Sequence, residues 1–390
     1  MLGLVYVCVL SFAIAMQSVP PVLSLIMDEL RLSHAQGGLL MSLFAVPGIV
    51  IAIPAGMLAD RYSQKTIGIV SLVLIVTGMT VFASGNSFLM LGLGRVVSGA
   101  GAITLIVLAS MVLAQWFAGR ELGVAMGVFN TGMPLGTILS FNLLSRLGER
   151  LGWQASAWFG AGLSLVVLVI FILLFTPAPR SSKGKSLPPE GFFQGIRLSG
   201  KSIWIMGVAW LFFNASALSM FTFTPSFLTS TGLTIAGAGF LVSIVMWPSP
   251  LVSPLVGYVT DRIGYKRLMI AIGGMAMTIL MVLLPTAIDW MVWLLLLMGI
   301  SQGIVPTPVM ALAPEVTPPE RLGLGFGIIM TCSFLGISAG PASTGWFRDF
   351  TGSYQASYAL MSGFAFMIVV AMFILSRMRN KTPPDIHGNE

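Results

Sequence analysis

Arg95 is the ionisable residue that lies deep within a long apolar run of the sequence. The aspartates and glutamates all fall in polar segments or at the ends of apolar runs, so none is placed to neutralise it. A guanidinium in hydrocarbon is costly and usually faces a cavity or a partner. It also holds a carboxylate through two parallel hydrogen bonds. Two interpretations of Arg95 therefore stay open: a ligand for a small organic or inorganic anion, or a structural brace between helices.

Other reactive side chains are too few for catalysis. The two cysteines, Cys8 and Cys332, sit in apolar runs, and the two histidines, His34 and His387, fall in a short loop and in the polar tail. This excludes a disulfide scaffold and a His/Cys metal site. No Gly-x4-Gly-Lys-Ser/Thr loop occurs, so ATP is not the energy source. The sequence predicts no enzyme, no cofactor and no metal.

Composition places the chain in a membrane. Of the 390 residues, 56% are hydrophobic and 8% are charged, against about 45–50% and 25% in soluble domains. The apolar runs are long enough for helices that cross a bilayer and too uniform for barrel strands. The sequence predicts an all-α membrane protein with twelve transmembrane helices, at about 2–27, 36–59, 66–84, 88–115, 121–145, 153–176, 202–228, 234–259, 268–285, 290–313, 322–346 and 354–376.

The distribution of basic residues predicts the orientation. With a cytoplasmic N-terminus, fifteen lysines and arginines fall in inside segments and four, Arg31, Arg146, Arg150 and Arg348, fall outside. This positive-inside bias predicts a multi-pass protein of a cell (inner or plasma) membrane, with both termini cytoplasmic. The formal charge of +7 lies in scattered loops rather than in one patch, so the predicted partner is the lipid bilayer and not nucleic acid.

An internal repeat divides the chain into two halves. Gly56-Met-Leu-Ala-Asp60-Arg61-Tyr-Ser-Gln-Lys65 matches Gly257-Tyr-Val-Thr-Asp261-Arg262-Ile-Gly-Tyr-Lys266, at an offset of 200 to 201 residues. A repeat at a fixed period indicates a duplicated structural unit. The sequence resembles the major facilitator superfamily, whose signature is a Gly-x-x-x-Asp-Arg-x-Gly-x-Lys/Arg loop. Ser63 replaces the usual glycine in the first copy.

The resemblance implies two six-helix bundles related by a pseudo-twofold axis, with a solute cavity between them and alternating access. We expect bundles at 1–176 and 202–376, a cytoplasmic linker at 177–201 and a tail at 377–390. The resemblance also implies a gating role for the two loop copies. The expected gating residues are Gly56, Asp60, Arg61, Lys65, Asp261 and Arg262.

Neutral polar side chains near the middle of helices that line the cavity in this family are further candidates for solute binding. Besides Arg95, they are Gln17, Asn130, Asn214, Trp247, Ser301 and Gln302. Each is also able to form a hydrogen bond between helices instead.

The segments Trp247–Pro250 and Pro306–Pro308 are expected to be bends or mobile breaks, because proline removes a backbone donor. Glycines at helical spacing in the fifth and eleventh spans are expected to form packing faces; they are Gly123, Gly127, Gly132, Gly136, Gly323, Gly327, Gly336 and Gly340.

The favoured function is transport of a small organic anion, such as a monocarboxylate, by a monomeric secondary or facilitative transporter. The alternatives are a multidrug or neutral-solute exporter of the same superfamily, and a membrane sensor without turnover. A missing proline after Gly136, where Thr137 stands, and the absence of carboxylates within spans disfavour a drug/proton antiporter.

Overall fold

A computed structural model describes residues 1–61, 63–117, 121–176, 200–317 and 322–378. Within these ranges only the backbone is described for residues 52–61, 123, 261, 263, 322 and 323. The described chain contains twelve helical segments long and apolar enough to cross a membrane, which confirms the number predicted from the sequence.

The first six spans contain nine helical elements and one π-helical segment. They are α1 (Leu2–Met16), η1 (Pro20–Val22), α2 (Leu23–Leu30), α3 (His34–Arg61), α4 (Gln64–Ala83), α5 (Phe88–Trp116), α6 (Leu122–Leu139), the π-helical η2 (Ser140–Leu144), α7 (Ser145–Leu151) and α8 (Trp153–Leu174). The next six spans follow the residues at which the sequence predicts a linker. They contain α10 (Lys201–Ser230), α11 (Ile235–Ser243), η3 (Ile244–Met246), α12 (Ser249–Ile263), α13 (Lys266–Leu283), η4 (Ile288–Trp290), α14 (Met291–Ile304), α15 (Pro306–Val316), α16 (Leu322–Thr351) and α17 (Tyr354–Arg377).

Three spans are interrupted at prolines. The first is broken between α1 and η1, where Pro20 and Pro21 follow. The eighth changes to the 3-10 segment η3 before Pro248, and the tenth is divided between α14 and α15 at Pro306. Proline supplies no backbone donor and clashes with the preceding turn, so a helix tends to end before it. Two of these breaks lie at the proline clusters singled out in the sequence; their mobility stays a prediction.

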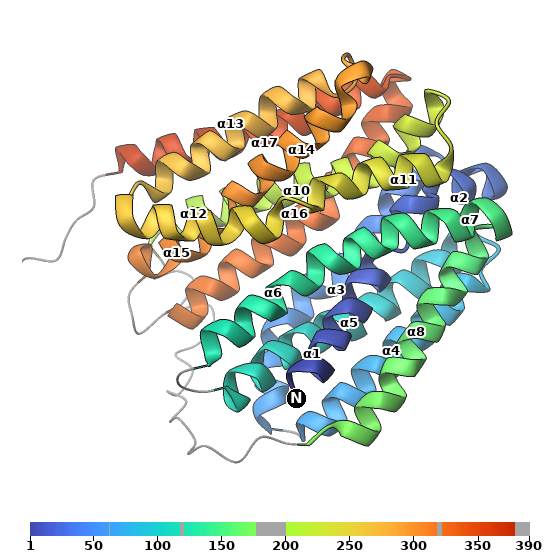
Figure 1. Ribbon diagram of the computed structural model, residues 1–390, viewed down its shortest axis with the longest axis horizontal. Helices are drawn as coiled ribbons and strands as arrows, with labels where there is room; N and C mark the ends of the chain where they lie inside the picture. Colours follow the sequence, from blue (N-terminus) through green and yellow to red (C-terminus); the bar gives the residue numbers. More distant parts are fainter. Residues whose placement is uncertain (62, 118–120, 177–199, 318–321, 379–390) are drawn as a thin grey trace, which may run out of the picture.

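The two sets of helices lie side by side and meet at one end (Figure 1). We call this the closed end; there α3 and α11 begin and α7 and α16 end. The ribbons of the two sets diverge toward the opposite end (Figure 1). At the closed end α3 and α16 touch through their backbones. A Cβ atom on Gly38 would meet the carbonyl of Pro341, and one on Gly345 would meet the carbonyl of His34.

The glycine stripes act partly as predicted. Gly132 and Gly136 on α6 face Val9 and Ala13 of α1, while Gly336 and Gly340 on α16 lie against the backbone of α10. Close approach of this kind favours small residues between membrane helices. Gly127 has open space beside it, so it does not belong to this packing face.

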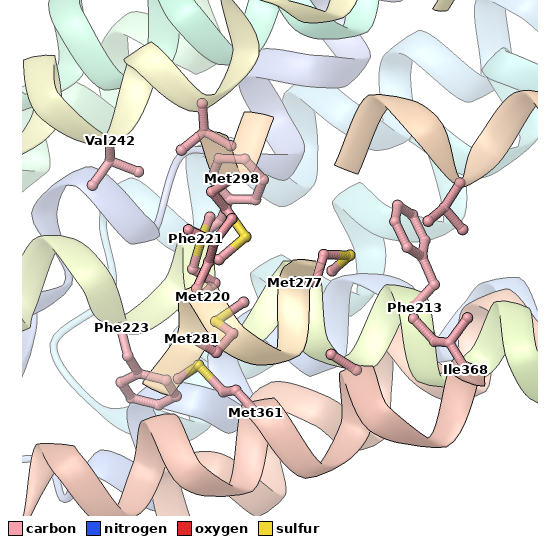
Figure 2. Close-up of a cluster of buried hydrophobic side chains, with 14 of the residues drawn as sticks. Phe213, Met220, Phe221, Phe223, Val242, Met277, Met281, Met298, Met361 and Ile368 are labelled. Atoms are coloured by element: carbon pink, nitrogen blue, oxygen red, sulfur yellow. The ribbon is translucent and has the colours of Figure 1, made fainter. Parts of the chain in front are cut away.

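Methionine and aromatic side chains fill the core of the second set of helices. Met220, Phe221 and Met298 gather at one point, and Met281 and Met361 lie beside Phe223 (Figure 2). The unbranched thioether side chain adapts to irregular gaps, so methionine is well suited to fill the space between the aromatic rings.

A buried hydroxyl pair ties α17 to α10. Tyr358 is fully buried, and its hydroxyl donates to Oγ1 of Thr224 at 2.9 Å. Such a bond contributes about 1 kcal/mol net, so Tyr358→Phe and Thr224→Val should each lower the melting temperature of the purified protein by a few degrees. The double variant should lose less than the sum, because both singles remove the same bond. Fully additive losses would contradict this assignment.

Candidate solute-binding site

A cavity of about 190 Å³ lies between the two sets of helices. Its polar lining residues are Gln17, Thr137, Ser249, Ser253 and Gln302. Its apolar walls include Met16, Met133, Phe213, Leu218, Phe221, Val245 and Met246. Among the residues that the structure describes, those lining the cavity carry amide or hydroxyl groups and no formal charge. An apolar wall with a few convergent hydrogen-bonding groups is typical of a small-molecule site.

Gln17 lines the cavity with a buried side-chain oxygen that lacks a hydrogen-bond partner within the described chain. It follows the last residue of α1, so the break in the first span places it there. The side chain is 2% exposed, and its Oε1 atom has no hydrogen-bond partner within the described chain. A buried acceptor without a donor costs about 1–3 kcal/mol. A solute that carries a donor would supply the missing hydrogen bond.

Gln302 brings a second amide to the cavity from α14. Its Nε2 atom lies 3.8 Å from Sδ of Met220. Thioether sulfur is a weak acceptor. The Nε2 group of Gln302 therefore gives up little hydrogen-bond energy if it donates to a solute instead. The cavity therefore presents an amide from each set of helices.

Arg95 lies outside the cavity lining and is fully buried. Its Nε donates to the carbonyl of Leu40 at 3.0 Å. Nη1 donates to the carbonyl of Ala15 at 2.7 Å and to Oγ of Ser18 at 3.1 Å, and Nη2 donates to the carbonyl of Met16 at 3.0 Å. The guanidinium also lies over the ring of Phe44, 4.4 Å from its centroid.

These contacts are those of a brace. Ala15 and Met16 are the last residues of α1, and the last carbonyls of a helix lack partners within it. A cation at this end also interacts favourably with the helix dipole. Arg95 thus stabilises the break after Met16 and holds Gln17 in the cavity wall. Its charge lies directly behind that wall, since Met16 itself lines the cavity.

Four other predicted binding residues do not line the cavity. Asn214 and Ser301 are buried and bond to backbone carbonyls of their own helices, those of Trp210 at 2.8 Å and Met298 at 2.8 Å. Asn130 is exposed on α6. Trp247 is 48% exposed, and its ring packs edge-on against Phe240. Asn130 precedes the lining residues Met133 and Thr137 by three and seven positions, so it lies on the same face of α6 but outside the cavity lining.

The structure adds Thr137, Ser249 and Ser253 to the cavity wall. Ser249 and Ser253 are four residues apart on α12 and therefore share one helical face. This four-residue spacing of two serines is visible in the sequence and indicates a polar face on the helix. Thr137 follows Gly136, which packs on α1, so it lies near the same helix interface.

The predicted gating residues lie at the ends of helices, away from the closed end. Gly56, Asp60 and Arg61 belong to α3 and Asp261 to α12, and their side chains lie outside the described residues. Lys65 stands near the start of α4, and Arg262 is exposed, with its guanidinium 4.8 Å from the centroid of the Tyr258 ring. The gating role of all six stays a prediction.

The family follows from comparison with known sequences. The chain matches the profile of the Major Facilitator Superfamily over residues 5–237 and 225–389. It belongs to this superfamily. It is a multi-pass membrane transporter of a small solute, not an enzyme, and the resemblance seen in the loop motifs is confirmed.

Relatives and solved structures agree with this assignment. The chain is 23% identical to the lysosomal dipeptide transporter MFSD1 of Danio rerio, over 90% of this chain and 81% of that protein. It is 22% identical to the hexuronate transporter of Bacillus subtilis, over 89% of this chain and 87% of that one.

The fold matches a bacterial homolog to the human lysosomal transporter Spinster, in an inward-facing and unoccupied conformation. The TM-score is 0.77, with 18% identity over 96% of both chains. It also matches the nucleoside transporter NupG, with a TM-score of 0.78 and 16% identity over 96% of this chain and 99% of that one. These matches confirm the all-helical fold predicted from the sequence.

Proposed function

We propose that this superfamily member moves a small organic solute by alternating access and binds it in the cavity between Gln17 and Gln302. The observation that carries the proposal is the buried, unpartnered Oε1 of Gln17, at a break in the first span. Discontinuous helices near the bilayer midplane commonly form the binding sites of secondary transporters. The solute supplies a hydrogen-bond donor to Gln17 and an apolar body to the methionine and phenylalanine walls.

For the substrate class we propose a small organic acid with a hydroxyl or protonated carboxyl group. Two features support an acid: the charge of Arg95 lies directly behind the wall formed by Met16 and Gln17, and a relative at 22% identity is a hexuronate transporter. Arg95 acts through its field and not as a ligand, because its donors are engaged by backbone carbonyls and Ser18.

A neutral solute is the second candidate, and the uncharged cavity lining favours it. Matched pairs of compounds separate the two, namely organic acids and their carboxamides of the same shape. A ligand that binds the folded protein raises its melting temperature. Stabilisation by the acids and not by the carboxamides supports the anion proposal; the reverse result supports the neutral solute, and stabilisation by neither class contradicts both.

We also propose that the closed end faces outside and that both termini face the cytoplasm. The fifteen basic residues assigned to the other side support this orientation. We further propose that the chain consists of two halves, 1–176 and 202–376, joined by a linker at 177–201 and followed by a tail at 377–390. We also propose that it is a monomer. The favoured location is a cell membrane. Labelling of an exposed cysteine near either end of the helices, in intact cells and in lysed cells, tests the orientation.

Gln17→Leu should raise the KM for the transported solute about three- to tenfold, since a net hydrogen bond contributes about 0.5–1.5 kcal/mol. The melting temperature without solute should stay the same or rise, because leucine removes a buried acceptor that has no donor. Uptake into proteoliposomes and thermal melts give the two readouts. Gln355→Leu is the matched control, since it makes the same substitution at an exposed residue of α17 outside the cavity lining. An unchanged KM in Gln17→Leu would remove this residue from the site.

A further inference from the structure

Asp349 of α16 caps the first turn of α3, which belongs to the other set of helices. Its Oδ1 accepts the backbone N–H of His34 at 3.0 Å, and its Oδ2 accepts the backbone N–H of Ala35 at 2.8 Å. Nδ1 of His34 also lies 2.9 Å from Oδ1. The first N–H groups of a helix have no partner within the helix, and a carboxylate there is favoured by the helix dipole. Asp349, from the second half, therefore supplies the hydrogen-bond acceptors that the first turn of α3, in the first half, lacks.

Glu149 of α7 does the same in the opposite direction. Its Oε2 accepts the backbone N–H of Ala236 in the first turn of α11 at 2.8 Å. The local cap of α11 is Thr234, whose hydroxyl takes the N–H of Gly237 at 3.0 Å. Glu149 thus satisfies a different donor of the same turn, and it reaches that donor from the first set of helices.

The two contacts are related by the internal repeat. Asp349 follows Glu149 by 200 residues and Ala236 follows Ala35 by 201, which is the offset of the duplicated loops. Each half therefore contributes one carboxylate and one helix start, and the two caps cross between the halves in opposite directions. A chance surface contact does not explain two such contacts at equivalent positions.

We propose that Glu149 and Asp349 are positioning residues that hold the closed end shut by capping the helices of the opposite half. Both caps exist only while the halves touch at this end. When alternating access opens it, the N–H groups of α3 and α11 pass to water and both carboxylates lose their partners. The two residues thereby set the balance between the two conformations. The proposal rests on the family's alternating movement and not on the identity of the solute.

A third acidic residue at this end provides the matched control. Glu29 of α2 accepts Nε1 of Trp153 at 3.0 Å and Nε2 of Gln154 at 2.6 Å. Both donors belong to the same set of helices as Glu29 itself, so its loss weakens one half but breaks no contact between the halves. Glu29→Gln separates a specific effect on closure from a general effect of removing an acidic residue.

The experiment measures the distance across the closed end in the full-length protein. Spin labels are attached at Leu89→Cys and Ile288→Cys, exposed positions near the starts of α5 and α14, with Cys8 and Cys332 replaced by alanine. Pulsed electron resonance in nanodiscs, without solute, then gives the populations of the short and long distances. Uptake of the transported solute is not needed, so a wrong assignment of Gln17 does not affect the result.

In Glu149→Ala and Asp349→Ala we expect the ratio of long to short distances to rise roughly fivefold each, the usual strength of one helix cap. The double variant should show roughly the product of the two changes. The isosteric pair Glu149→Gln and Asp349→Asn, which keeps the fold if the alanine variants do not, should show a smaller rise in the same direction. Glu29→Gln should leave the ratio unchanged. Equal ratios in the parent and in the double variant, or an equal rise in Glu29→Gln, would overturn the proposal.

Discussion

Arg95→Gln is expected to destabilise the folded protein by about 3 kcal/mol or more, in the absence of any solute. The guanidinium donates to the carbonyls of Ala15, Met16 and Leu40 from a fully buried position. The carbonyl of Met16 has no alternative helical donor, because the residue four positions later is Pro20, which lacks an N–H. Glutamine is shorter and has two donors on one nitrogen, so it leaves buried acceptors unpaired.

Thermal melts of the purified protein without solute test this expectation. Arg95→Lys is the informative control, since it keeps the charge behind the cavity wall but removes the planar group that reaches three backbone oxygens. A brace predicts that both variants melt at clearly lower temperatures. A direct ligand predicts normal melting with lost solute binding. The second pattern would return Arg95 to the role of an anion ligand.

The sequence was sufficient for the fold because hydrocarbon imposes simple rules. A span needs a long apolar run and must be helical, since the backbone satisfies its own hydrogen bonds there. The repeated loops at Asp60 and Asp261 then gave the duplication. None of these signals depends on which way a side chain points.

The candidate site depends on which side chains of each helix face the cavity. The sequence of a membrane helix gives little information about this. A helix in lipid has apolar residues on all sides, so the usual periodicity that marks its buried face is weak. Gln17 and Gln302 line the cavity, whereas Trp247, which follows the 3-10 turn η3, is not among the lining residues and is half exposed. A break in a helix shifts the phase of every residue beyond it.

The sequence allows backbone carbonyls as partners of Arg95 but does not indicate which ones. A search of the sequence for an acidic residue finds none within the spans, but the structure uses the end of α1 instead. That end exists because Pro20 and Pro21 interrupt the span. The contacts of Glu149 and Asp349 cannot be inferred from the sequence either, because each joins the end of one helix to the start of a distant helix, and only the fold brings those two ends together.

Gly38→Val is expected to prevent closure of the closed end and to reduce transport at least tenfold. Gly38 lies on α3 against α16, and a Cβ there would sit 2.8 Å from the carbonyl carbon of Pro341 and 3.2 Å from Cζ of Phe223. Both neighbours belong to the other set of helices, and a buried backbone does not yield to an added side chain without a cost of about 1–3 kcal/mol. The halves avoid the clash by staying apart.

The spin-label distance across the closed end and uptake into proteoliposomes measure the two effects of Gly38→Val. Gly162→Val on α8 is the matched control, because, apart from the neighbouring backbone of α8 itself, no atom of the described chain lies within 4 Å of a Cβ at Gly162. Both variants replace a helical glycine by valine, so they share the same small gain of helix propensity. If Gly38→Val kept the short distance and normal uptake, α3 and α16 would not need direct backbone contact for the transport cycle. A long distance with a near-normal melting temperature is the expected result, because the clash lies between the halves and leaves the packing within each of them intact.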